Sequence, residues 1–381
     1  METAFPYTQY VTGKNFVGRR NDVLLLSNLL SQGEHVCLYE PPKTGKTSLV
    51  QQTLYSMRLS GKPFHVGQFS VLNIRTREDF LLRLGTTVLR MAASTPDAWT
   101  VLVQQHLGNT HFVFDRAAFT EKEAALSADG TLDEADCAAL LDLPFRLAEA
   151  TGQPFILIVD EFQCLSFSEA SDTVLRALDE SLKRNAGSKR FSYVFCGSGV
   201  NAMKSIFENG LLFHRRVERV SLSAVDEREI SDHIHRGFLT GGKVVDKELL
   251  VGACRLFKGQ LWYINHFAYL CDSMTRGYLM EPVLTDALKY LIATHEAHFS
   301  SIVNGLTTHQ VNFLKAVTEG VVRFSASDVI RRYDLHSSAN VKRVKDALMK
   351  KEVLLFDAED RPSFQDPLFE YWVRKYFFEQ K

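Results

Sequence analysis

The sequence predicts an α/β protein with a parallel sheet between helices, followed by an all-helical lid and a winged helix-turn-helix. Apolar runs without alternation at 155–159 and 191–196 are typical of strands buried on both faces, and predicted helices separate them, as in a doubly wound sheet. This β pattern stops at Asp226. The chain then ends in three short helices and a strand–turn segment, which is the outline of a winged helix.

Composition narrows the class of protein. The 381 residues are 45% hydrophobic and 23% charged, which is ordinary for a globular chain of about two to three domains. A net charge of −1 excludes a global attraction to nucleic acid or to an anionic membrane, so such binding needs a local patch. We expect a cytoplasmic protein without membrane contact, because we see neither a secretory signal nor an apolar run of about 18 residues.

Helices and strands are expected to alternate in a core domain over residues 1–223. Residues 92–150 are interpreted as a helical insertion that holds a loop at 111–115 and one helix at 133–150. Thr76 is expected to cap the helix that follows it. The other expected elements are a helix at 21–30, a strand at 36–39, a helix at 48–57, strands at 64–74 and 217–222, and a helix ending near 91.

The rest of the chain is expected to form a helical lid at 224–304 and a winged-helix domain at 305–381. A polar stretch at 300–305 is interpreted as the boundary between them. The expected helices are 226–238, 246–257, 260–275, 282–298, 309–319, 325–333 and 338–351, followed by a strand at 353–357, a turn at 358–361 and a helix from Pro367.

Residues 35–48 contain the motif on which the function hypotheses depend. A short apolar strand is followed by a turn that ends in Gly45-Lys46-Thr47, and a helix begins there. This strand–turn–helix is a P-loop (residues 40–47), in which backbone N–H groups and the Lys46 ammonium surround a phosphate and the Thr47 hydroxyl can hold Mg²⁺. The pattern asks for glycine where Glu40 stands; that position usually needs backbone freedom, and a carboxylate there repels phosphate unless it points away.

Asp160 and Glu161 follow a buried strand, at the end of a sheet where ligands bind in open α/β folds. Phosphoryl transfer needs positioning and charge neutralisation more than covalent chemistry. Lys46 would bridge the β- and γ-phosphates, Thr47 and Asp160 would hold Mg²⁺, and Glu161 would act as general base on the attacking water. The alternative is a loop that merely begins with two exposed acids.

Three further residues are candidates for the same chemistry. Ser198 follows the strand at 191–196 and would sense the γ-phosphate or orient the water, although a serine in this place is often a simple cap. Arg215 and Arg216 precede a strand and would stabilise charge in the transition state, either in cis or across the interface of a homo-oligomer. The alternative for these arginines is a solvated or salt-bridged surface pair.

Residues 337–351 form a basic segment that suits the major groove of double-stranded DNA. Acidic residues on the presumed wing keep open the alternative that the module docks on protein. The DNA interpretation assigns base or phosphate contacts to Ser338, Asn340, Lys342, Arg343 and Lys345.

These motifs together resemble the archaeal-type ATPases, a branch of the AAA+/STAND P-loop NTPases. The similarity covers nearly the whole chain except 92–150. Its motifs are Asn15-Phe-Val-Gly-Arg19, the Walker A segment Tyr39 to Ser48, the Walker B segment Phe155 to Glu161, the sensor strand Val194 to Ser198, the arginine segment Leu212 to Arg216, Gly259 near the lid motif, and the ending Asp366-Pro-Leu-Phe-Glu-Tyr-Trp-Val373.

The resemblance implies an ATPase core, a helical lid and a winged helix, with ATP or ADP and Mg²⁺ as ligands. It places Phe16 and Val17 near adenine. The residues expected to surround the phosphates are Pro42, Lys43, Thr44, Gly45, Lys46, Thr47 and Ser48.

Three functions fit these observations. The first is an ATPase that hydrolyses ATP slowly and uses nucleotide state to move its lid and winged helix. The second is a nucleotide-gated scaffold or signalling switch without hydrolysis, which Glu40 favours. The third is an ATP-dependent DNA-binding regulator, which the basic segment at 337–351 favours.

Overall fold

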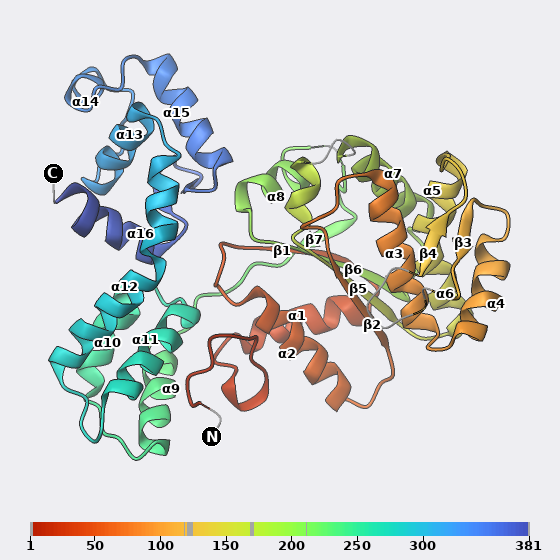
Figure 1. The fold of residues 1–381 in the computed structure, drawn as a ribbon, viewed down its shortest axis with the longest axis horizontal. Coiled ribbons are helices and arrows are strands. Elements are labelled where there is room, and N and C mark those ends of the chain that lie inside the picture. Colours follow the sequence, from red (N-terminus) through yellow and green to blue (C-terminus); the bar gives the residue numbers. More distant parts are fainter. Residues whose placement is uncertain (1–2, 118, 120–124, 168–170, 211, 380–381) are drawn as a thin grey trace. The chain divides into compact units, whose positions relative to one another are not determined.

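The computed structural model describes residues 3–117, 119, 125–167, 171–210 and 212–379 (Figure 1). The chain divides into two compact units. One, here called the sheet unit, consists of Arg20–Glu40 and Thr53–Ser221; the other, here called the lid unit, consists of Met1–Arg19, Pro41–Gln52 and Leu222–Lys381. The P-loop after Glu40 therefore belongs to the same unit as the C-terminal part of the chain.

The sheet unit contains a five-stranded parallel sheet in the order β2-β5-β6-β1-β7. This confirms the predicted parallel sheet. Its strands are β1 (His35–Tyr39), β2 (His65–Ser70), β5 (Phe155–Asp160), β6 (Phe191–Gly197) and β7 (Val217–Arg219).

Two strands are shorter than predicted. β2 ends at Ser70 because the chain turns there, and the Ile74 N–H bonds to the Val71 carbonyl at 3.0 Å. β7 ends at Arg219, although Val220 still donates one hydrogen bond to the Cys37 carbonyl. In both places apolar residues continue beyond the end of the strand, so the sequence pattern predicted a longer strand than the hydrogen-bonded ladder forms.

Figure 1 shows helices on both faces of the sheet, with α1 (Arg20–Ser31) on one face and α7 (Ser171–Arg184) on the other. The predicted cap at Thr76 is confirmed, since Thr76 and Asp79 form a capping box at the start of α3 (Arg77–Ala92). The other elements along this part of the chain are the short 3₁₀ helix η1 (Gly13–Asn15), α2 (Lys46–Leu59), the 3₁₀ segment η2 (Phe162–Phe167) and α8 (Val200–Phe207).

The insertion contains α4 (Pro96–Leu107), β3 (Phe112–Phe114), β4 (Leu126–Ala128), α5 (Glu134–Leu141) and α6 (Leu143–Thr151). Two predictions were wrong here. The loop expected at 111–115 is strand β3, which pairs antiparallel with β4. The single helix expected at 133–150 breaks at Asp142, because Pro144 has no N–H to continue the α5 ladder and starts a new helix instead.

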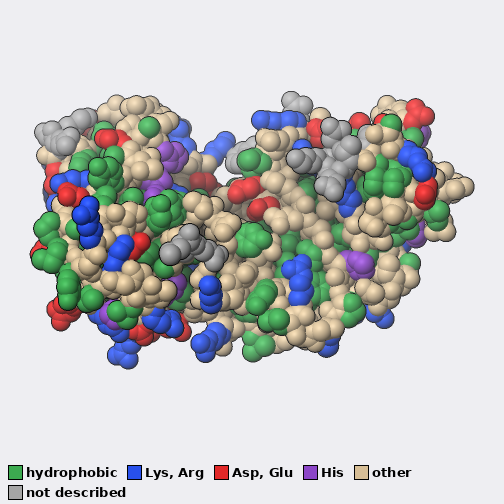
Figure 2. Space-filling model, turned by 60° about the horizontal axis from the view of Figure 1, so that its bottom comes forward, with side chains coloured by type: hydrophobic (Ala, Val, Ile, Leu, Met, Phe, Trp, Pro, Cys, Tyr) green, Lys and Arg blue, Asp and Glu red, His purple; other side chains and the backbone are tan. Residues whose placement is uncertain are grey.

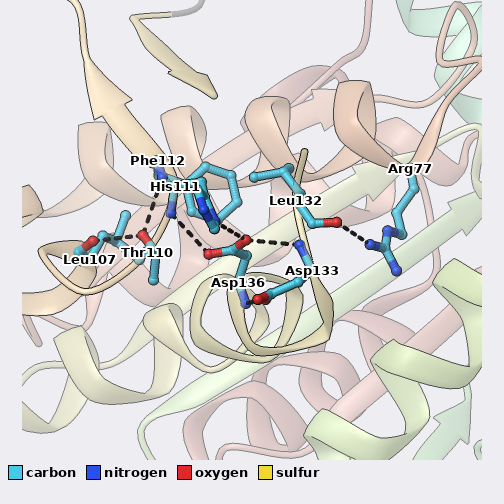
Figure 3. Close-up of polar contacts among 8 residues, drawn as sticks. All are labelled: Arg77, Leu107, Thr110, His111, Phe112, Leu132, Asp133 and Asp136. Atoms are coloured by element: carbon cyan, nitrogen blue, oxygen red, sulfur yellow. Dashed lines mark hydrogen bonds and ion pairs between the residues drawn. The ribbon is translucent and has the colours of Figure 1, made fainter. Parts of the chain in front are cut away.

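His111 and Asp136 face each other beside the β3–β4 hairpin (Figure 3). Asp136 Oδ1 accepts from the His111 backbone N–H at 2.9 Å, and Oδ2 lies 2.8 Å from His111 Nδ1. Asp133 completes a capping box with Asp136. These three residues lie close enough to hold a metal ion, but both Asp136 oxygens are already hydrogen-bonded, and we interpret the group as a structural clasp.

From Glu227 onward the lid unit is built of helices and their connecting loops, apart from a two-stranded wing and an isolated bridge between Val244 and Tyr278. Phe5 and residues from Ile230 to Val373 form one apolar core, so the helical segment and the winged helix are packed together. Its elements are α9 (Glu227–Thr240), α10 (Lys247–Leu256), α11 (Leu261–Met274), α12 (Glu281–Asn304), α13 (Thr308–Thr318), α14 (Ser327–Arg332), α15 (Ser338–Lys350), β8 (Leu354–Phe356), β9 (Pro362–Phe364), α16 (Pro367–Trp372) and a π-helical turn, Val373–Phe378.

The winged-helix outline is confirmed by α13, α14, α15 and the antiparallel pair β8–β9. The predicted end of the helix at 282–298 was wrong, because residues 299–304 continue α12. Phe299 and Val303 are buried on this helix, and their packing keeps the polar stretch helical. In the part of the chain that the structure describes, no helix has the length and apolar character to cross a membrane.

Candidate functional site

A cavity of about 280 Å³ lies in the lid unit, beside the start of α2. Three separate parts of the chain line it. They are the N-terminal segment (residues 6–11 with Phe16, Val17 and Arg19), residues 43–48 of the P-loop and the start of α2, and Leu261, Trp262 and Asn265 of α11. Phe16 and Val17 therefore share a cavity with Lys46, Thr47 and Ser48.

The P-loop has the backbone of an anion site. Gly45 has φ +99° and Lys43 has φ +66°, and such left-handed residues turn successive N–H groups toward one point. α2 begins at Lys46 and has 14 residues, so its N-terminal N–H groups and dipole add to this site. Lys46 Nζ donates to the Pro41 carbonyl at 2.9 Å, and Thr47 is exposed in the first turn.

Glu40, which stands where the pattern asks for glycine, does not have a positive φ. The unusual conformation falls on Lys43, where a residue with a Cβ carries the left-handed strain. Glu40 is half-buried and directly follows β1 in the sequence.

Arg19 connects the N-terminal segment to the P-loop. Its Nη1 donates to the Thr44 carbonyl at 2.7 Å and its Nε to the Ser223 carbonyl at 2.9 Å. A Cβ on Gly45 would lie 2.9 Å from Arg19 Nη1, the movable end of a long side chain, so it is φ +99° that requires glycine at position 45. Sequence reasoning did not include Arg19 in the site, although it ends the Phe-Val-Gly-Arg motif.

Aromatic and amide side chains form the other wall of the cavity. Tyr7 stacks on His266 with ring centres 4.0 Å apart, and Trp262 meets Tyr7 edge to face at 5.9 Å. Asn265 Nδ2 holds the Pro6 carbonyl at 3.1 Å. Flat aromatic faces beside a polar amide suit the planar ring of a nucleobase. Sequence reasoning missed Tyr7, Trp262 and Asn265, because no local pattern joins the N-terminal segment to α11.

The sheet unit carries the acidic residues. β1, β5 and β6 are parallel, with Tyr39 paired to Gly197 and Val159 to Phe195, so their C-terminal ends lie at one edge of the sheet. Asp160 ends β5 there, and its Oδ1 accepts from the Glu161 N–H at 2.9 Å. The strand β1 leads from this same edge into the P-loop.

Glu161 and Ser198 are brought together at this edge. Ser198 Oγ donates to Glu161 Oε2 at 2.7 Å, and Gln163 Nε2 donates to the same carboxylate oxygen and lies 3.2 Å from Ser198 Oγ. Glu161 has φ +52°, which turns the chain sharply after β5. Gln163 was missed by sequence reasoning, because a glutamine two residues after an acid has no motif to mark it.

The arginine pair is divided between two environments. Arg216 binds Asp179 through Nε at 3.0 Å and Nη2 at 2.6 Å, and the Asp179 side chain is 1% exposed. Burial alone would raise the pKa of Asp179, but hydrogen bonds from Lys183, the Phe213 N–H and Arg216 lower it. Arg215 has φ +58° and is exposed. Arg216 thus has a structural partner, whereas Arg215 faces solvent.

On α15, only part of the predicted basic surface is free to reach another molecule. Lys342 and Arg343 are exposed. Lys345 pairs with Asp360 of the wing and lies 4.2 Å from the centre of the Phe356 ring.

Two polar candidates differ in the same way. Asn340 Nδ2 donates to the Leu335 carbonyl at 3.0 Å, whereas Ser338 is exposed. Figure 2 shows basic and acidic side chains interspersed on the face that it draws.

A parallel sheet with a strand–loop–helix anion site is the fold of P-loop ATPases, and in this chain a helical lid and a winged helix follow it. The Walker-type ATPase PABY2304 of Pyrococcus abyssi is similar over 98% of this chain and 100% of its own, with a TM-score of 0.69 and 15% identity. The ORC2 protein of Aeropyrum pernix, solved as ADPNP–ADP complexes, is similar over 96% of this chain and 93% of its own, with a TM-score of 0.59 and 14% identity.

At the level of sequence, a model of a probable winged helix domain matches residues 297–375. Comparison with curated protein sequences gave no match. These similarities confirm the P-loop ATPase fold and the C-terminal winged helix.

Proposed function

We propose that the chain binds ATP or ADP with Mg²⁺ at the P-loop and hydrolyses ATP slowly. The observation that carries this proposal is the cavity that residues 43–48 of the P-loop and the start of α2 line together with Phe16, Val17 and Trp262. One end of such a cavity suits phosphate and the other suits a base. The ORC2 protein of A. pernix, which has the same fold, was solved with ADPNP and ADP.

Each candidate residue has a defined task in this proposal. Lys46 neutralises the β- and γ-phosphates, and the P-loop N–H groups orient them. The exposed Thr47 hydroxyl and the Asp160 carboxylate at the end of β5 are oxygen donors of the kind that Mg²⁺ prefers, and the ion would neutralise phosphate charge. Glu161 takes a proton from the attacking water, and Ser198 orients that carboxylate.

Calorimetric titration of MgATP and MgADP tests the binding step, with turnover measured on the same samples. We expect Lys46→Ala to lose most of the affinity, because in this proposal the Lys46 ammonium neutralises the β- and γ-phosphates. Lys62→Ala is the matched control, since Lys62 is exposed in the turn after α2. Heat of binding that is equal in wild type and Lys46→Ala would remove the proposal.

Turnover of Glu161→Gln tests the assignment of the general base. Removal of a general base typically lowers rate by about 10²–10⁴-fold, so we expect hydrolysis to fall by at least about 100-fold while MgATP still binds. Unchanged turnover in this variant would refute the role of Glu161.

A non-hydrolysing nucleotide-gated switch is the second candidate. The observation that favours it is that Glu161 Oε2 already accepts hydrogen bonds from Ser198 and Gln163. If this state persists with nucleotide bound, ATP and ADP bind while turnover stays at background. Gln163→Ala separates the two functions, because freeing Glu161 should raise the turnover of a restrained enzyme. Brisk Mg²⁺-dependent hydrolysis by the wild type excludes the switch.

The third candidate is an ATP-dependent DNA-binding regulator, favoured by the exposed Lys342 and Arg343 on α15.

We propose a core domain at 1–223, a lid at 224–304 and a winged-helix domain at 305–381 as the moving parts in all three functions. Arg215 is the better placed of the two arginines for transition-state stabilisation, in cis or in a homo-oligomer, because Arg216 is bound to Asp179.

A further inference from the structure

Lys43 of the P-loop is held by the lid and by the winged helix. Its Nζ donates to the Tyr263 hydroxyl at 2.8 Å, lies 3.8 Å from Asp366 Oδ2, and sits over the rings of Trp262 and Tyr263 at 4.6 and 4.5 Å. Tyr263 in turn donates to Asp366 Oδ2 at 2.5 Å. All these residues belong to the lid unit, so this contact is internal to one compact body.

Asp366 joins this contact to the backbone of the winged helix. Its Oδ1 accepts from the N–H groups of Leu368 and Phe369 at 2.9 and 3.1 Å, which caps α16. Its Oδ2 accepts from Tyr263. One carboxylate therefore stabilises the start of α16 with one oxygen and the anchor of Lys43 with the other.

The surroundings of Lys43 make this contact specific for a cation. The side chains of Lys43 and Asp366 are 25% and 29% exposed, and Tyr263 is fully buried. Burial lowers the pKa of Lys43, and Asp366 opposes this effect. Two aromatic faces and a carboxylate compensate the ammonium for lost water.

The backbone of Lys43 explains what the contact is for. Lys43 has φ +66°, a conformation that is unfavourable for a residue with a Cβ. This conformation helps turn the loop N–H groups toward one point, as an anion site requires. A strained residue persists only where its surroundings over-determine it, and here those surroundings are Tyr263 and Asp366.

We propose that Tyr263 and Asp366 are positioning residues that hold the P-loop in its phosphate-binding shape through Lys43, and so couple nucleotide binding to the winged helix. This inference rests on the proposed nucleotide binding. Because coupling is reciprocal, nucleotide that orders the loop also strengthens the contacts of Asp366 and protects α16.

Calorimetry with MgADP on a set of full-length variants tests the proposal. We expect Tyr263→Phe and Asp366→Asn each to weaken binding by about tenfold, within the range of measured couplings. In a Lys43→Gly background neither change should weaken binding further, because glycine adopts the left-handed conformation unaided. Glu370→Gln is the control: Glu370 lies on the same helix and pairs with Lys258 and Arg374, outside this contact.

Hydrogen exchange of α16 is the second readout, and it does not depend on turnover. We expect MgADP to slow exchange at residues 367–372 in wild type and in Glu370→Gln, but not in Tyr263→Phe. Because Tyr263→Phe removes a single oxygen, it keeps the test valid if Asp366→Asn fails to fold.

The outcomes separate the two proposals. Wild type that binds MgADP while Tyr263→Phe and Asp366→Asn bind equally well overturns the positioning role alone. The same holds if the losses persist in the Lys43→Gly background, since Asp366 would then act by another route. Absence of MgADP binding by wild type overturns the proposed function and this inference with it.

Discussion

Arg215 and Arg216 are adjacent in sequence, but their side chains lie in different environments. Arg216 pairs with the Asp179 carboxylate, whose side chain is 1% exposed. Arg215 is itself in the left-handed conformation, and its side chain is exposed. A buried acid left without its cation is costly, because its charge has lost water without gaining a partner. We therefore expect stability to depend on Arg216, and Arg215 is the arginine that we propose for transition-state stabilisation.

This contrast leads to a paired test. We expect Arg216→Ala to lower the free energy of unfolding by about 3 kcal/mol, because it leaves Asp179 buried beside one remaining cation, Lys183. Arg215→Ala should change stability by less than about 0.5 kcal/mol while lowering ATP turnover. Urea denaturation followed by fluorescence, with turnover on the same samples, measures both. Equal losses of stability in the two variants would contradict the division of duties.

His111 gives a pH dependence at the same scale. The Asp136 hydrogen bond and charge raise the pKa of His111 above its ordinary 6.5. A raised pKa means that the stabilisation is fully present below about pH 6.5 and is lost as pH rises through the folded-state value.

We expect the β3–β4 hairpin of wild type to be better protected from hydrogen exchange than that of His111→Gln at pH 6. The difference should shrink by pH 8.5. His309→Gln is the control, since His309 lies in the lid unit and should leave the hairpin unchanged at both values. A difference that grows with pH would contradict the assignment.

At the scale of elements, the P-loop depends on two residues in left-handed conformation, one a glycine and one a lysine. Gly45 has φ +99°, a conformation that glycine adopts without strain. Lys43 reaches the same region of φ without the freedom of glycine, because residues of α11 and the start of α16 hold it. The loop is thus shaped partly by its own sequence and partly by the helices packed beside it.

Substitution of Gly45 tests the first of these. We expect Gly45→Ala to abolish measurable MgADP binding and to lower the free energy of unfolding by about 1–3 kcal/mol, because φ +99° is strained for alanine and the new methyl meets Arg19. Gly242→Ala is the matched control. Gly242 also has a positive φ but open space around it, so its variant should lose some stability and keep its nucleotide affinity.

At the scale of the whole molecule, a net charge of −1 leaves no general attraction for nucleic acid. The exposed cations of α15 number fewer than the sequence indicated, since Lys345 is paired with the wing. If this chain reads DNA, it does so through a small number of phosphate contacts. Such binding is weak and is lost at modest salt, and its salt dependence is shallow because the slope scales with the number of phosphate contacts.

We therefore expect duplex DNA to shift in native gels at low ionic strength and to be released by about 0.2 M salt. Lys342→Ala and Arg343→Ala should each weaken the shift and flatten its salt dependence, because each removes about one phosphate contact. Lys289→Ala is the control, since Lys289 is exposed on α12 outside the winged-helix face. A duplex that never shifts at low salt makes the winged helix a protein-docking module.

The sequence by itself determined the parallel strands, the P-loop, the acidic end of β5 and the winged helix. These are local patterns, since a buried strand is an unbroken apolar run and the anion site needs consecutive residues at the start of a helix. Its errors also have local causes. The motif lacks glycine at Glu40, but the left-handed residue with a side chain is Lys43. The helix predicted at 133–150 ignored Pro144, which ends one helix and lies in the first turn of the next, α6.

Only the tertiary structure decided which residues of α11 line the cavity, that Arg216 pairs with Asp179, and that Tyr263 and Asp366 contact Lys43. Lys43 and Tyr263 are 220 residues apart in sequence, and Tyr263 and Asp366 are 103 apart. No periodicity reports contacts of that range, because they depend on which helices pack together and on the buried charges that each must satisfy.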